Sequence, residues 1–159
     1  RGGSQDYYIF TSENDFKNKV SNDFFLEHAL VHGNFYGTSK DFVETKIAEG
    51  INIILEIDVQ GVQQIKSTNF PHESIFLLPP SIDSLTERLN ERGTNSKESI
   101  ELRLSNAMKE IPSCIDYDHI LVNDVFEDCC NDLARIITGE SSFPMNSKKE
   151  LFLTKLLNS

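Results

Sequence analysis

The clearest apolar pattern in the chain lies near its middle and ends in two acids. Residues 53–62 have the sequence IILEIDVQGV, in which apolar positions follow one another around Glu56 and Asp58. Strands of a parallel sheet are covered on both faces, so they show continuous apolar runs rather than alternation. The pattern predicts a buried strand over residues 51–57, with both acids near its carboxyl end, where open α/β sheets bind ligands. Solvated acids at an exposed strand end would give the same pattern.

Shorter apolar runs and helix caps complete the predicted order of elements. Residues 75–78 and 120–122 are typical of two further core strands. The pattern also predicts helices at residues 39–49, 59–66, 81–91, 99–111, 127–138 and 148–157. Strands that alternate with helices from residue 39 onward indicate a parallel α/β sheet flanked by helices. The part before residue 39 indicates a smaller lobe, with a helix at 12–22 and short strands at 7–10, at 24–32 and from 35.

Composition excludes several classes of function. The formal net charge of −10 disfavours a nucleic-acid or anionic-membrane surface, because such surfaces need an excess of basic residues. No apolar run is long enough to span a bilayer, and the first residues lack the apolar core of a signal peptide. The three cysteines, two of them adjacent, argue against a disulfide framework, so we expect a cytoplasmic protein. Histidines and cysteines do not combine at ligand spacing, so we expect no zinc site.

Three of the five arginines lie around one polar loop. Arg88 and Arg92 are four residues apart on a predicted helix, and Arg103 lies in the helix that follows the loop at residues 93–97. Guanidinium groups bind phosphate in a bidentate way, so this spacing is compatible with an anion site. Surface ion pairs with neighbouring glutamates would explain the same spacing.

Polar residues also interrupt the apolar segments of the N-terminal lobe. Tyr8, Tyr36 and Thr38 carry hydroxyls that can bind a ligand, and Glu27 interrupts the stretch FFLEHALV. A carboxylate can accept hydrogen bonds from the N1–H and the exocyclic amine of guanine. A glutamate that points to solvent would give the same pattern. Asn123 ends a core strand, where it either contacts a ligand or caps the next helix.

In order and spacing, these motifs resemble the guanylate kinase family. The matching stretches are DYYIF, FFLEHALVHGNFYGTS, IILEIDVQGVQQIK, IFLLPPSIDSLTERLNERGT, SIELRLSNAMKEI and ILVND. They span residues 6–140, and a match in this order over most of the chain is far more specific than a match to any single motif. The resemblance implies a P-loop-type parallel sheet core with three regions: a GMP-binding lobe at 1–38, a kinase core at 39–140 with a lid at 92–98, and a helical tail at 141–159.

The resemblance also implies the reaction and its participants. A member of the family transfers the γ-phosphate of ATP to GMP with Mg²⁺, so ATP and GMP are the implied small-molecule partners. Phosphoryl transfer depends on positioning and on charge stabilisation by arginines and Mg²⁺, without a covalent nucleophile. Closure of the lobe and the lid would exclude water from the site. Neither a nucleic acid nor a membrane is implied, and the sequence carries no signal of an oligomeric state.

The GMP side of the site follows from the resemblance residue by residue. Tyr8 and Tyr36 match the tyrosines that hold the GMP phosphate. Glu27 and Thr38 match the carboxylate and the hydroxyl that recognise guanine, and Asp58 matches a second acid on that side.

The ATP side is implied in the same way. Arg88, Arg92 and Arg103 match the lid-side arginines that surround ATP and the transferring phosphoryl group, which makes them the implied catalytic residues. Asn123 matches a residue near the adenine. Glu56 stands where the family usually has aspartate, so the resemblance assigns it no role.

One motif of the family does not occur in these 159 residues. The phosphate-binding loop G-x-x-x-x-G-K-[ST] is absent, and in the family it belongs to a strand and a helix that would precede Arg1. Arg1 lies closer to Tyr8 than the family's paired arginines do. Nothing else supplies the backbone N–H donors and the lysine that hold ATP phosphates. We therefore expect a polypeptide of residues 1–159 alone to be inactive or poorly soluble, and a longer one with the loop to be active.

Two alternatives remain from the sequence. A guanylate-kinase-like binding module of the scaffold type would keep the fold and bind a protein partner without catalysis. Asp58, the three arginines and Asn123 favour an enzyme, because a binding module does not need them. Another nucleoside monophosphate kinase is disfavoured by Glu27 and Asp58 as a pair that recognises guanine.

Overall fold

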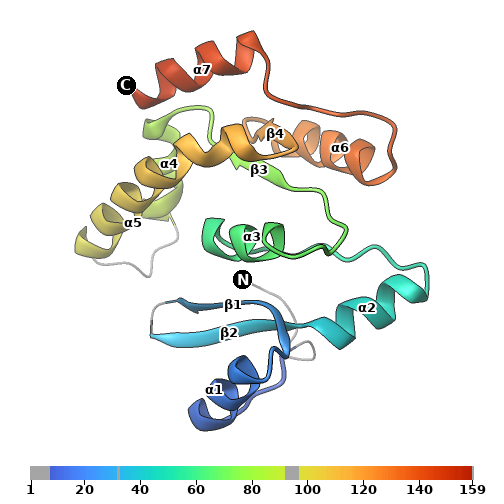
Figure 1. The fold of residues 1–159 in the computed structure, drawn as a ribbon. Coiled ribbons are helices and arrows are strands. Elements are labelled where there is room, and N and C mark those ends of the chain that lie inside the picture. The colour runs from blue at the N-terminus through green and yellow to red at the C-terminus, as the bar shows by residue number, and fades with distance from the viewer. Residues whose placement is uncertain (1–7, 32, 92–96, 159) are drawn as a thin grey trace. The chain divides into compact units, whose positions relative to one another are not determined.

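The chain divides into two units of contacting residues, Arg1–Pro71 and His72–Ser159. We analysed a computed structural model that describes residues 8–31, 33–91 and 97–158 (Figure 1). The boundary between the two units, at Pro71, differs from the predicted boundary at residue 38. The predicted boundary separates regions by the ligand that each is expected to bind, whereas the units are defined by contacts between residues. The predicted lobe, core and tail therefore remain a functional prediction. None of the helices in the described ranges is long and apolar enough to cross a membrane.

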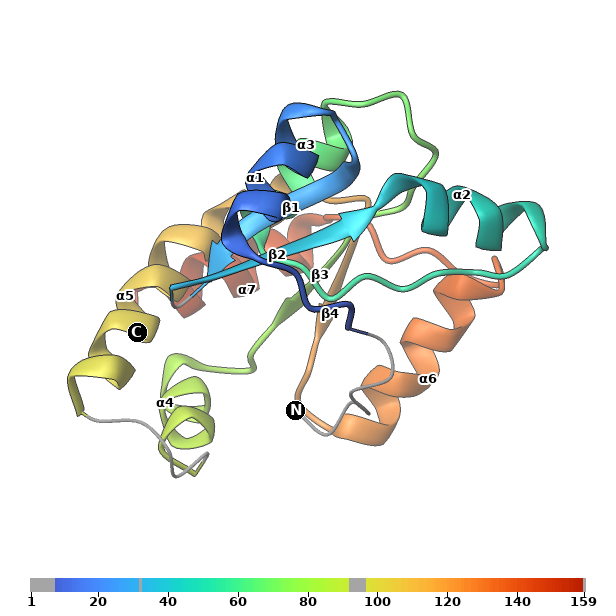
Figure 2. The ribbon, with the colours of Figure 1, turned by 90° about the horizontal axis from the view of Figure 1, so that it is seen from below.

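The first unit is an antiparallel hairpin with helices packed against it. Its elements are α1 Glu13–Ser21, β1 Phe25–Val31, β2 Asn34–Ser39, α2 Lys40–Ala48 and α3 Val59–Lys66. Side chains of Ser12, Ser39 and Asp58 cap α1, α2 and α3, each accepting a hydrogen bond from a backbone N–H in the first turn. Both α1 and α3 contact β1 (Figure 2). Sequence periodicity predicted all three helices to within a residue or two.

Two small clusters hold the hairpin in this unit. Leu26, Val43 and Ile65 are buried together, which joins β1 to α2 and α3. Phe16 of α1 stacks on Phe25 of β1, with ring centroids 4.6 Å apart, and also stacks on Phe35 of β2. Aromatic stacking adds to the burial of these rings. The hairpin is thus packed on one side by aromatic rings and held to α3 by aliphatic side chains.

The buried strand predicted at residues 51–57 is wrong. Residues 51–58 form neither helix nor strand, and Ile51 and Ile54 are 45% and 63% exposed. Leu55 and Ile57 do pack against the aliphatic cluster. A strand forms only where a neighbour supplies partners for its backbone N–H and C=O groups, and no described strand pairs with this segment. An apolar run predicts burial, but it cannot supply that neighbour.

The strand predicted at residues 7–10 is also absent over its described part. Residues 8–10 have no regular structure, and Ile9 and Phe10 are largely exposed. As in the previous case, no strand in the described ranges lies beside them. Local β-propensity without a pairing partner does not make a strand.

The second unit contains a parallel strand pair, which confirms the predicted α/β class. Its elements are β3 Ile75–Leu78, α4 Ile82–Glu91, α5 Lys97–Glu110, a 3₁₀ helix at Ile111–Asp116, β4 His119–Val122, α6 Phe126–Ile137 and α7 Ser147–Leu157. Ile75 lies opposite His119, and Leu78 lies opposite Val122. Leu78 of β3 and Ile120 of β4 are buried in a core shared with the helices that follow, together with Ile111, Cys114 and Leu156.

The C-terminal tail binds the edge of β4 that faces away from β3. The backbone N–H of Ile120 donates to the carbonyl of Phe143 at 2.7 Å, and the N–H of Phe143 donates to Nδ1 of His119 at 3.1 Å. The ammonium group of Lys149, on α7, donates to the carbonyls of Ile120 and Phe143 at 2.6 and 2.7 Å. Polar backbone groups at a strand edge need partners, and the tail provides them.

Candidate functional site

Three of the predicted GMP-side residues share one face of the hairpin. Glu27 of β1 lies directly opposite Thr38 of β2, and Tyr36 lies opposite Ala29, two residues further along. Residues two apart on a strand, and residues directly opposite each other, point to the same side. The hydroxyl of Thr38 donates a hydrogen bond to Oε1 of Glu27 at 2.5 Å. The pairing of two strands therefore brings together side chains that are separated in sequence.

The first turn of α3 lies beside the same carboxylate. Asp58 caps this helix, and its Oδ1 accepts a hydrogen bond from the N–H of Gly61 at 2.9 Å. A Cβ atom added at Gly61 would lie 3.1 Å from Oε2 of Glu27, which is closer than most carbon contacts. The Glu27 carboxylate therefore lies between Thr38 on one side and Gly61 on the other. Asp58 is near this site, but as a helix cap rather than at the end of a strand.

Glu27 is a buried acid with few partners. Glu27 is only 5% exposed, and no Lys, Arg or His of the described residues forms an ion pair with its carboxylate. Burial of a carboxylate is costly unless hydrogen bonds or a cation compensate it. A carboxylate offers about four acceptor positions, of which Thr38 uses one. This group can therefore accept N–H donors from a bound ligand.

One predicted GMP-side residue, Tyr8, and the acid Glu56, to which no role was assigned, stand apart from this face. Tyr8 precedes α1 and is 61% exposed, and in the described part of the chain no hydrogen bond joins it to Glu27 or Thr38. Glu56 is exposed in the irregular segment before α3. Among the predicted GMP-side residues, the structure thus groups Glu27, Thr38 and Tyr36 on the hairpin, with Asp58 nearby.

In the second unit, two predicted ATP-side residues are linked. The guanidinium group of Arg88, on α4, donates to the backbone carbonyl of Asn123 at 2.9 Å and, more weakly, to that of Asp124 at 3.5 Å. Arg88 thus bonds the backbone that follows β4 rather than a surface glutamate. Arg103 lies half-buried on α5. Arg92 and most of the predicted lid lie outside the described residues.

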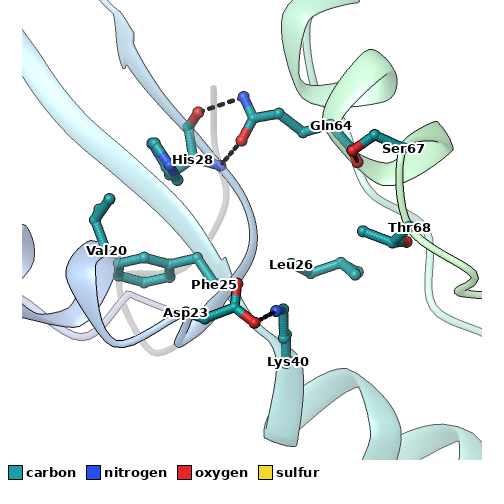
Figure 3. A pocket seen from close by; sticks show the side chains of 9 residues that line it. All are labelled: Val20, Asp23, Phe25, Leu26, His28, Lys40, Gln64, Ser67 and Thr68. Carbon is teal, nitrogen blue, oxygen red and sulfur yellow. Dashed lines mark hydrogen bonds and ion pairs between the residues drawn. The ribbon is translucent and has the colours of Figure 1, made fainter.

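Each unit also has a cavity. A cavity of about 440 Å³ lies between α4 and α5 and is lined by Thr86, Asn90, Lys97, Ile100, Glu101 and Leu104. A smaller one of about 180 Å³ in the first unit is lined by residues of α1, β1, α3 and the chain around them, and Figure 3 shows it. The predicted GMP-side residues do not line this smaller cavity. Its wall includes an ion pair between Asp23 and Lys40.

Sequence reasoning missed two positions of α3 near the site. Gly61 leaves room for the Glu27 carboxylate, and the side chain of Gln64 binds the backbone of His28. Both lie in the stretch IILEIDVQGVQQIK, so the motif contained them. Their partners are far away in sequence, so no local pattern could have assigned these contacts.

The described residues do not by themselves form a metal site. They include no group of three His, Cys, Asp or Glu side chains that could hold an ion. Mg²⁺ in phosphoryl-transfer sites is usually held by few carboxylates together with phosphates and water. The side chains in the described ranges thus do not assign a position to Mg²⁺.

Comparison with known proteins gives a consistent result. The family model described as guanylate kinase matches residues 2–140. Curated guanylate kinases from Buchnera aphidicola and Escherichia coli K12 are 40% and 41% identical over 153 and 155 residues, which cover 95% and 96% of this chain and 74% of each relative. The relative from Carboxydothermus hydrogenoformans is 43% identical over 138 residues, covering 87% of this chain and 68% of that protein.

A solved structure agrees with the sequence relatives. The crystal structure of guanylate kinase from Anaplasma phagocytophilum aligns with a TM-score of 0.68 at 29% identity, covering 99% of this chain and 78% of that one. Both the family match and the relatives extend over most of the chain. The chain therefore belongs to the guanylate kinase family.

Proposed function

We propose that this protein transfers the γ-phosphate of ATP to GMP, giving ADP and GDP, and that it does so in the cytoplasm. The observation that carries the proposal is the buried carboxylate of Glu27, bonded by Thr38 and without an ion-pair partner among the described residues. The relatives bear the name of the enzyme, which argues against a binding module without activity.

Guanine recognition follows from the chemistry of this carboxylate. Guanine presents two neighbouring N–H donors, at N1 and at the exocyclic amine, and a carboxylate accepts both. Adenine has an acceptor at N1 and no amine at C2, so it would turn a lone pair and a C–H toward the buried acid and leave it unsatisfied. A site that forms hydrogen bonds to a polar group of its ligand binds an analogue without that group much more weakly, because a buried polar group then stays unpaired. Thr38 donates to one oxygen of Glu27 and thereby restrains the carboxylate that would meet the base.

The remaining GMP-side residues complete the proposal. Tyr36 lies on the same hairpin face and is 40% exposed, so its hydroxyl is accessible to the phosphate of GMP. Tyr8 would join it when the ligand is bound. Asp58 holds the first turn of α3 beside Glu27 and supplies a second acid near the base.

On the ATP side, we assign Arg88, Arg92 and Arg103 to the phosphates and Asn123 to the adenine. Arg88 uses part of its guanidinium group to bond the carbonyl of Asn123, and a guanidinium carries five donors in a rigid fork. Donors therefore remain for phosphate oxygens, and the carbonyl contact fixes the direction of the fork. Mg²⁺, when bound with the nucleotide, would neutralise charge on the transferring group.

The proposal is tested by GMP binding and its selectivity. We expect Glu27→Gln to weaken GMP at least tenfold in calorimetry, roughly the cost of an unpaired group in a buried polar site, and to reduce the preference over AMP. Glu44→Gln changes an exposed glutamate of α2 and serves as the matched control. Phosphoryl transfer is measured in a coupled ADP assay with the protein as its gene encodes it. Unchanged GMP affinity in Glu27→Gln would refute the assignment.

A further inference from the structure

Three positions of α3, spaced three residues apart, face the strand that carries Glu27. They are Asp58, which caps the helix, Gly61, which lies against the Glu27 carboxylate, and Gln64. Positions three apart lie close together on one side of a helix. The proposed function uses Asp58. Gln64 has no part in it, although its side chain binds the backbone of β1.

Gln64 binds both polar groups of one residue in β1. Its Oε1 accepts from the backbone N–H of His28 at 3.0 Å, and its Nε2 donates to the carbonyl of His28 at 2.8 Å (Figure 3). A neighbouring strand would make the same two bonds. One side-chain amide therefore takes the place of a strand partner and joins segments 36 residues apart.

This pair of bonds fixes β1 along its own axis. A shift of the strand by one residue would turn each side chain to the other face and would offer the amide a different peptide. Consecutive residues of a strand direct their N–H and C=O groups to opposite edges, so a shift by one residue would break both bonds. Hydrophobic contacts of Leu26 and Ile65 alone would allow some sliding, because they have no direction.

Glu27 immediately precedes His28, so the same register decides where its carboxylate lies. Oε2 of Glu27 is next to Gly61, one helical turn before Gln64, and Oε1 is bonded by Thr38. The carboxylate is therefore held from β2 through Thr38 and from α3 through the backbone of His28. Binding sites lose affinity when their contacting groups are misplaced by about an ångström.

We propose that Gln64 is a positioning residue for guanine recognition, which acts through His28 on Glu27 and does not touch the base. The inference rests on the proposed function, because it assumes that Glu27 accepts the N–H donors of guanine. It adds a residue whose loss should change selectivity among purine nucleotides, not only stability.

The test compares two nucleotides that differ by one donor. IMP keeps the N1–H of GMP but lacks the exocyclic amine, so the ratio of IMP and GMP dissociation constants reports how well Glu27 is aligned. The variant is Gln64→Met, which keeps the length of the side chain and removes both bonds to His28. The control is Gln63→Met, the same change at the exposed neighbour on α3. Thermal unfolding is recorded for each variant.

We expect Gln64→Met to weaken GMP about tenfold, as for the loss of one hydrogen bond to a charged group, and to weaken IMP less. The IMP-to-GMP ratio should fall in Gln64→Met and stay at the wild-type value in Gln63→Met. In a Glu27→Gln background, Gln64→Met should no longer change the ratio, because the group on which it acts is gone.

A merely structural role of Gln64 gives a different result. Loss of folded protein would lower the apparent binding of both nucleotides equally, so an unchanged ratio in Gln64→Met overturns the inference. If Gln64→Met does not fold, Gln64→Glu serves instead: it keeps the bond from the His28 N–H, loses the one to the carbonyl, and should also lower the ratio. If wild-type protein does not prefer GMP, or if Glu27→Gln keeps the preference, the proposed function fails instead.

Discussion

At the scale of single residues, the hydroxyl of Thr38 determines how the buried acid is presented. It donates a hydrogen bond of 2.5 Å to Oε1 of Glu27. We expect Thr38→Val to weaken GMP by about tenfold, because a hydrogen bond to a charged group contributes roughly 1.5–3 kcal/mol. Calorimetry measures the change, with Thr45→Val at an exposed position of α2 as the control. Equal affinities in the two variants would show that Thr38 does not orient the carboxylate.

The sequence singled out these residues but did not reveal their surroundings. Glu27 stood out because it interrupts an apolar stretch, and the register of the hairpin then placed Thr38 opposite it. The sequence could not show that Glu27 is buried, since an outward glutamate gives the same pattern. The contact between Gln64 and His28 was also invisible, because it depends on how α3 packs against β1 rather than on either segment alone.

At the scale of elements, helices were predictable and isolated strands were not. Caps such as Ser12 and Ser39 and the apolar periodicity beside them are local, so they determine a helix within its own segment. Strands need a neighbour, which explains why residues 75–78 formed β3 beside β4 whereas residues 51–57 formed no strand. Residues 51–57 carry five apolar side chains in seven positions, so a high apolar content alone does not make a strand.

The first turn of α3 gives a prediction that separates stability from binding. Gly61→Ala should favour the helix by about 1 kcal/mol from propensity alone. The added Cβ would lie 3.1 Å from both Oε2 of Glu27 and Cβ of Ile57, so the carboxylate or the helix must move. We expect little net change in thermal unfolding and a several-fold loss of GMP affinity, as a displaced acceptor implies. Gln60→Ala, at an exposed position of the same helix, is the control.

An undiminished GMP affinity in Gly61→Ala would contradict the close approach of α3 to Glu27. A large loss of stability would instead mean that the crowding at Ile57 outweighs the gain in helix propensity. Both quantities come from the same purified variant, so the two effects are read independently.

The start of α7 gives a prediction on pH. Burial lowers the pKa of the Lys149 amine below its ordinary value of 10.5, and Asp132 opposes this shift in part. Between the lowered pKa and 10.5, the unfolded chain binds the proton more tightly than the folded one, so stability from this group rises with pH. Below the lowered pKa, the contribution is constant and unfavourable.

We therefore expect Lys149→Met to lack this rise, whereas Lys148→Met, at the exposed neighbour, keeps it. Denaturant unfolding at a series of alkaline pH values measures the difference between the two variants, in which the titration of other groups cancels. Parallel curves for both variants over that range would show that burial does not perturb Lys149.

At the scale of the whole molecule, membership in the family rests on the order of motifs along the chain rather than on one site. The family model and the relatives cover both units, although the predicted GMP-side residues lie in the first and the ATP-side residues in the second. The two halves of the proposed reaction can thus be assigned separately, each from contacts within its own unit.

The C-terminal tail covers an edge of β4 through which two copies of the chain could otherwise associate. Without residues 142–159, the N–H and C=O of Ile120 would have no partner at that edge, and a second copy could supply one. We expect the protein truncated after Ser141 to form concentration-dependent assemblies in light scattering, while Lys148→Met stays as dispersed as the wild type. A truncated protein of unchanged size would mean that the strand edge is protected by other means. If the truncated protein assembles, proteolytic trimming of this end is a route to aggregation rather than a harmless loss.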